Sequence, residues 1–78
     1  MYHFAPDPDQ PKADLYRELA ASVAALVAGE RDSVANMANV AALVWQFVPR
    51  LNWAGFYRVI GDELVLGPFQ GAAACIRI

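Results

Sequence analysis

The spacing of apolar residues changes near Pro49, and this change constrains the fold more than any other feature of the chain. Before Pro49, apolar residues recur every three or four positions, which is the spacing of a helix face. After it, they form short runs of aromatic and β-branched residues, which are typical of strands. The sequence therefore predicts an α+β domain with two N-terminal helices packed on an antiparallel sheet, the helices over 11–28 and 33–48 and three strands over 53–60, 63–67 and 72–78.

Residue types that begin and end helices occur at the expected positions. Asp9 is a candidate cap for the first helix, and Gly29 suits the position just after its end. Asp32 or Ser33 begins the second helix. Pro49 ends that helix, because proline cannot continue the backbone hydrogen bonds.

The second helix carries apolar residues on two faces, so we expect it to be buried on two sides. One stripe contains Val40, Leu43 and Phe47. The other stripe should face the sheet and contains Val34, Met37, Ala41, Val44 and Val48.

Length and composition limit the function classes. A chain of 78 residues makes one domain, and its hydrophobic fraction of 58% is high, since ordinary domains have about 45–50%. We therefore expect apolar surface that more chain or a partner covers, with self-association as one outcome. The net charge is −2 and there is no basic patch, which argues against nucleic acid or an anionic membrane as a partner.

Several kinds of segment and site are missing from the sequence. No apolar run approaches the roughly 18–20 residues of a membrane span, and the first residues have no features of a secretory signal. One cysteine cannot form an internal disulfide, so we expect a reducing, cytoplasmic location. Without a glycine-rich phosphate loop or a His or Cys pair at metal spacing, no cofactor or metal is expected. His3 lies in a proline-rich tail over 1–11, which we expect to be extended, and it is most simply a solvated residue.

An aromatic pair on the first predicted strand is a candidate ligand site. Strand alternation puts Trp53, Gly55 and Tyr57 on one face, and Gly55 should leave a dent between the two rings. A dent with aromatic walls suits a small ligand that carries a methyl group or a cation. The alternative is that both rings pack against the helices.

Cys75, the single cysteine, lies on the last predicted strand and shares a face with Arg77. A guanidinium beside a thiol favours the thiolate, which is the reactive form. The alternative is a small buried residue, which is the usual place of a free cysteine.

Three segments together resemble the signature of the free methionine-(R)-sulfoxide reductases, which are single-domain enzymes with the GAF fold. The segments are Asn52-Trp53-Ala54-Gly55-Phe56-Tyr57, Leu64-Val65-Leu66-Gly67-Pro68-Phe69-Gln70-Gly71 and Ala74-Cys75-Ile76-Arg77-Ile78, with Ala35-Asn36-Met37-Ala38-Asn39 fitting as well. The resemblance covers about two thirds of this chain and the first half of a family member. It implies that 12–78 is the N-terminal part of a GAF domain.

The resemblance also implies an activity and roles for three residues. In the family, a catalytic cysteine attacks the sulfoxide sulfur of free methionine sulfoxide and becomes a sulfenic acid; a resolving cysteine then closes a disulfide that thioredoxin reduces. By position, Cys75 matches the resolving cysteine, and Trp53 and Tyr57 match aromatic residues that line the substrate site.

The family pattern continues with residues that these 78 do not contain. A glycine-rich loop with a second cysteine would follow Ile78, and then the catalytic cysteine and the carboxylates that bind the substrate ammonium. We therefore expect a fragment that is inactive by itself. The alternative is a GAF-type module that binds a small molecule or regulates, without catalysis.

Overall fold

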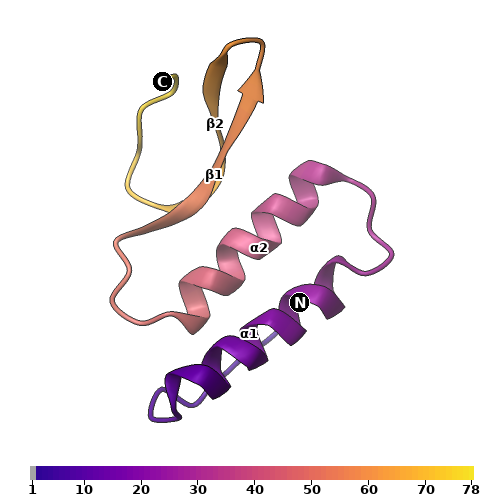
Figure 1. Ribbon diagram of the computed structural model, residues 1–78, viewed down its shortest axis with the longest axis vertical. Coiled ribbons are helices and arrows are strands. Elements are labelled where there is room, and N and C mark those ends of the chain that lie inside the picture. The colour runs from indigo at the N-terminus through magenta and orange to yellow at the C-terminus, as the bar shows by residue number, and fades with distance from the viewer. Residues whose placement is uncertain (1) are drawn as a thin grey trace.

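The computed structural model describes residues 2–78 and contains two helices followed by one β-hairpin (Figure 1). The helices are α1 (Lys12–Val27) and α2 (Ser33–Phe47), and the strands are β1 (Trp53–Ile60) and β2 (Glu63–Gly71). The predicted α+β class, the order of the elements and the helix bounds are confirmed to within one residue at each end. The predicted third strand is not confirmed.

Local chemistry explains most of the helix ends. The Asp32 carboxylate accepts a hydrogen bond of 2.9 Å from the Ala35 amide, which satisfies a donor in the first turn of α2. Gly29 has φ +80°, a left-handed conformation that glycine adopts without strain just after a helix. The predicted cap at Asp9 is wrong, because Pro11 occupies the cap position of α1 and no side chain bonds there.

The molecule has three layers, with α2 between α1 and the hairpin (Figure 1). Leu43 and Phe47 are buried against Leu15 of α1, and Phe4 of the tail packs on the same cluster. The opposite side of α2 contacts both strands, where Ala41 is 2% exposed. Burial of α2 on two sides is therefore confirmed, and both helices lie on one side of the sheet, in successive layers.

Two members of the predicted sheet-facing stripe lie elsewhere. Val34 is 53% exposed in the first turn of α2. Val48 follows the last helical residue with an extended backbone, so it leaves the helical phase and lines a groove with Leu15 and Tyr16 of α1. Residues spaced three or four positions apart share a face only where the backbone is helical, so the predicted stripe does not extend to Val48.

The hairpin contains a β-bulge, and this bulge decides the register beyond it. Tyr57 pairs with Leu66 but Gly55 pairs with Phe69, so Phe56 lies opposite two residues, Gly67 and Pro68. The predicted end of this strand at Gly67 is wrong, because β2 continues to Gly71. Pro68 fits within the strand because a bulge leaves one residue out of the ladder, where no amide hydrogen is needed.

The predicted third strand is present only as one bridge, between Val65 and Arg77. Backbone hydrogen bonds join Leu64 to Ile78 and Leu66 to Ile76, so the last three residues extend the sheet beside β2. Residues 72–75 are not strand, since Gly71 has φ +121° and the chain turns away from the hairpin before it returns (Figure 1).

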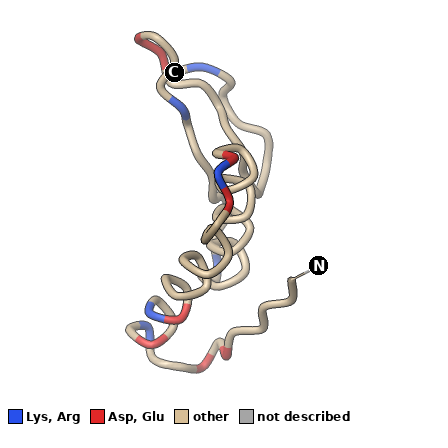
Figure 2. Tube along the Cα trace, turned by 90° about the vertical axis from the view of Figure 1, so that its right-hand side faces the viewer, with Lys and Arg blue, Asp and Glu red and all other residues tan. Residues whose placement is uncertain are grey.

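Charged residues lie at the ends of the elements. Figure 2 shows them on the tail and first turns of α1, in the connection to α2 and around the tip of the hairpin. No charged residue occurs in α2, in agreement with its central place.

Candidate functional site

Three aromatic rings from the two strands form a cluster on the sheet. The ring centroids of Trp53 and Tyr57 are 6.0 Å apart, and those of Trp53 and Phe69 are 5.5 Å apart with an interplanar angle of 17°. These separations lie in the range of favourable aromatic pairs. We call Trp53, Tyr57 and Phe69 the aromatic cluster. Trp53 and Tyr57, the two residues predicted from the sequence, therefore lie together, and Phe69 adds a third ring.

The expected dent at Gly55 is filled by the protein itself. A Cβ atom at this position would overlap Cβ of Phe69 and would lie 2.8 Å from Cη2 of Trp53. Glycine is therefore required because Phe69 and the indole of Trp53 approach its backbone. A ligand would have to contact the rings at their exposed edges or displace one of them.

The sequence did not predict Phe69 as a residue of the site. Counting pairs outward from the hairpin turn without a bulge sets Phe69 opposite Ala54, which is 8% exposed. The bulge shifts the pairing by one residue and puts Phe69 opposite Gly55, on the face of Trp53 and Tyr57. The Gly67-Pro68 pair is the sequence feature from which this shift of Phe69 to the other face could have been predicted.

The segment that carries the cysteine contacts the aromatic cluster directly. The Tyr57 hydroxyl donates a hydrogen bond of 2.8 Å to the backbone carbonyl of Cys75. The cysteine is free and exposed, so the alternative of a small buried residue is wrong. Arg77, the expected neighbour of the thiol, forms an ion pair of 3.5 Å with Glu63.

The indole nitrogen of Trp53 is buried and has no hydrogen-bond partner in the described part of the chain. Such donors are uncommon and need an explanation, for instance an acceptor that a ligand supplies. Trp53 and Gly55 also line a shallow groove between β1 and α2, whose other walls are Val40, Ala41, Val44, Leu51, Ala54 and Phe56. This groove does not include Tyr57.

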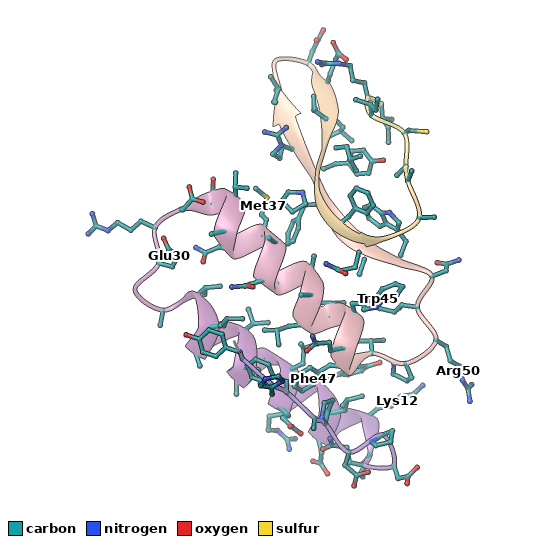
Figure 3. The ribbon with its side chains drawn as sticks, turned by 180° about the vertical axis from the view of Figure 1, so that it is seen from behind. Lys12, Glu30, Met37, Trp45, Phe47 and Arg50 are labelled. Atoms are coloured by element: carbon teal, nitrogen blue, oxygen red, sulfur yellow. The ribbon has the colours of Figure 1, made fainter. Side chains whose placement is uncertain are left out.

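Figure 3 shows the side chains of the described residues, with Met37 and Trp45 labelled on α2. Trp45 is 38% exposed, so it is not part of a closed core. Among residues 2–78, no group of three His, Cys, Asp or Glu side chains could hold a metal ion. None of the described helices is long and apolar enough to cross a membrane.

Comparisons with known proteins identify relatives of this chain. No protein-family model matches it. It is 48% identical over 67 residues to the free methionine-R-sulfoxide reductase of Escherichia coli strain K12, an alignment that covers 86% of this chain and 41% of the relative. Its structure resembles the free methionine-R-sulfoxide reductase of Neisseria meningitidis, solved in complex with its substrate, with a TM-score of 0.84 and 46% identity over all of this chain and 46% of that one.

The homologues of this chain include free methionine-R-sulfoxide reductases. A second solved neighbour is a candidate GAF sensor protein from Burkholderia vietnamiensis, with a TM-score of 0.86 and 55% identity over 88% of this chain and 44% of that one. The fold is therefore GAF-like, as the resemblance implied. The chain spans less than half the length of the relatives it matches.

Proposed function

We propose that residues 12–78 are the N-terminal part of a GAF-fold enzyme that reduces free methionine-(R)-sulfoxide to methionine. In this proposal the aromatic cluster borders the substrate, and Cys75 is the resolving thiol. The observation that carries the proposal is the hydrogen bond of 2.8 Å between Tyr57 and Cys75, because it joins the aromatic wall to the segment with the thiol. The homology to free methionine-R-sulfoxide reductases supports the same assignment.

The reaction needs two thiols, and these residues supply one. A first thiolate bonds to the sulfoxide sulfur and the oxygen takes up a proton; the oxygen then moves to the cysteine sulfur as the sulfur–oxygen bond and the new sulfur–sulfur bond break, which leaves a sulfenic acid and releases methionine. A second thiol then attacks the sulfenic sulfur, which forms a disulfide and releases water. We assign Cys75 to this second step and the attacking cysteine to residues outside the 78. The 78-residue chain alone should therefore show no turnover.

The reductant in this proposal is a dithiol protein such as thioredoxin, which reopens the disulfide by thiol exchange in a reducing cytoplasm. The exposed position of Cys75 supports this role, because a protein partner must reach one sulfur of the disulfide.

Trp53 has a further part in the proposal. Its buried Nε1–H has no acceptor within the described chain, and a sulfoxide oxygen is a strong acceptor that could satisfy it. The exposed edges of the aromatic cluster would contact the methyl group on the sulfur.

A segment exchange tests the proposal. The matching residues of the Escherichia coli reductase are replaced by those of this chain, and the resulting exchange protein is assayed for thioredoxin-dependent reduction of each methionine sulfoxide epimer. We expect turnover of the free R-epimer. Trp53→Phe should raise KM about three- to tenfold, the range for one hydrogen bond. Cys75→Ser should leave one turnover but stop the thioredoxin-dependent cycle.

The matched control carries the same segment of the Neisseria meningitidis reductase. If the control turns over while a folded exchange protein with this chain's residues does not, the enzymatic proposal fails. Binding of the sulfoxide without turnover would then favour the second candidate, a GAF-type binding or regulatory module, which the likeness to a candidate GAF sensor supports.

A further inference from the structure

The sequence pattern assigned Tyr57 to a ligand, but its hydroxyl has a partner within the chain. The phenol donates to the Cys75 carbonyl, while the ring stacks on Trp53 at 6.0 Å. One side chain on β1 therefore contacts both the aromatic cluster and the backbone of the thiol-bearing residue.

The segment over 72–75 has little else to fix its position. Ala72, Ala73 and Ala74 have no polar side chains, and the segment lies outside the strands. It begins after Gly71, which pairs with Trp53, and ends at Ile76, whose carbonyl accepts from the Leu66 amide at 2.8 Å. The bond from Tyr57 therefore acts between two anchored ends, at the residue that carries the thiol.

The orientation of the phenol is itself determined by packing. Trp53 stacks on both Tyr57 and Phe69, and Phe69 occupies the space over Gly55. Rings that pack in this way have few alternative rotamers, so the hydroxyl meets the Cys75 carbonyl without a further loss of side-chain entropy.

We propose that Tyr57 is a positioning residue for Cys75, through the hydrogen bond from its hydroxyl to the Cys75 carbonyl. This inference rests on the proposed function in one respect, the role of Cys75 as resolving thiol. Removing the hydroxyl should release residues 72–75 while the rings stay stacked.

Two local probes report on this bond in the 78-residue chain. Cys75 is the only cysteine, so alkylation by iodoacetamide measures its reactivity alone. The Trp53 Nε1–H is buried, and Gly71 lies against the same edge of the indole, where an added Cβ would lie 3.1 Å from Trp53 Cδ1. Hydrogen exchange of this indole proton therefore reports on opening at the start of the segment.

The test compares Tyr57→Phe with the unmodified chain. We expect alkylation of Cys75 and exchange of the Trp53 indole and Ile76 amide to become about two- to tenfold faster, as expected for one neutral hydrogen bond. Exchange in α2 should stay unchanged. Tyr16→Phe removes a hydroxyl from a residue that is 50% exposed on α1 and should change none of these rates.

A second variant separates positioning from general loss of stability. Phe69→Leu weakens the stack but keeps the Tyr57 hydroxyl, and urea is added to match the unfolding free energies of the variants. Faster alkylation in Tyr57→Phe than in matched Phe69→Leu supports the inference. Equal rates in the two variants, or rates in Tyr57→Phe equal to those of the unmodified chain, overturn it. None of these rates depends on sulfoxide reduction. A negative result would therefore overturn the positioning role of Tyr57 and leave the segment exchange as an independent test of the proposed function.

Discussion

Gly55 is the residue on which the aromatic cluster depends most directly. Its missing side chain lets Phe69 and the indole of Trp53 approach the β1 backbone from the same side. The stacking of Trp53 on Phe69 and on Tyr57 follows from that approach. A change of one methyl group at Gly55 should therefore affect all three rings.

We predict that Gly55→Ala destabilises the chain by about 1–3 kcal/mol, the usual cost of overpacking. Urea unfolding measures the change, and near-ultraviolet circular dichroism should show a weaker aromatic signal. Gly61→Asn is the control, because the space around Gly61 is open and asparagine tolerates its φ of +64°. A Gly55→Ala chain as stable as the control, with an intact aromatic signal, would contradict the packing described here.

The element that sets this arrangement is the bulge in the hairpin. Phe56 faces two residues of β2, and the extra residue moves Phe69 to the face of Trp53. A deletion within a regular strand reverses the faces of the residues beyond it. A deletion at the bulge should instead leave an ordinary ladder in the same register.

We therefore predict that a chain without Pro68 folds with the Trp53–Phe69 stack intact. The cost should be small, about 1–2 kcal/mol, because only the local twist of the strands changes. A chain without Arg58, which pairs regularly with Val65, should fail to fold or lose the stack, because the same one-residue bulge would then put Phe69 opposite Ala54. Near-ultraviolet circular dichroism and urea unfolding report on both chains, and equal damage by the two deletions would show that the register is misassigned.

At the scale of elements, the sequence predicts what local rules determine. The helix bounds follow from Asp32, Gly29 and Pro49, each of which acts on its neighbours in the chain. The face of Phe69 depends on a bulge between two strands, and the irregular path of 72–75 depends on the φ of Gly71. The first depends on pairing between strands and the second on one backbone dihedral angle, and the spacing of residue types alone reveals neither.

The candidate site likewise has features that local rules predict and features that they do not. Strand alternation correctly put Trp53 and Tyr57 on one face, because that period belongs to the backbone. The bond from Tyr57 to Cys75 joins residues 18 positions apart, and the filling of the Gly55 dent needs both strands. The catalytic and substrate-binding roles of Trp53, Tyr57 and Cys75 remain proposals that the exchange protein tests.

In the whole molecule, the two helices lie on one side of the sheet, and several apolar residues on its other side are exposed. Val59 is opposite Leu64, which in turn pairs with Ile78, so the three side chains share a face. Their exposed fractions are 75%, 38% and 68%, and Ile76 in the neighbouring row is 70% exposed. Trp53 and Tyr57 also lie on this side, where an uncovered sheet face would leave them exposed, but the aromatic cluster half-buries both.

We predict that the 78-residue chain self-associates at micromolar concentration through this face, because exposed apolar strands recruit another chain. Sedimentation should show species larger than a monomer. Val59→Lys with Ile76→Lys should restore a monomer, whereas Val34→Lys, which changes an exposed valine on α2, should not. A monodisperse monomer of the unmodified chain with cooperative unfolding would mean that the 78-residue chain closes its own core.

The measurement that tests the central proposal most directly is the location of the disulfide in the exchange protein. The protein is reduced, treated with one equivalent of free methionine-(R)-sulfoxide without thioredoxin, digested under conditions that preserve disulfides, and mapped by mass spectrometry. We predict that Cys75 is joined to a cysteine of the Escherichia coli segment, with one methionine formed per disulfide. Formation of methionine with the Cys75 thiol still free would contradict its assignment as the resolving cysteine.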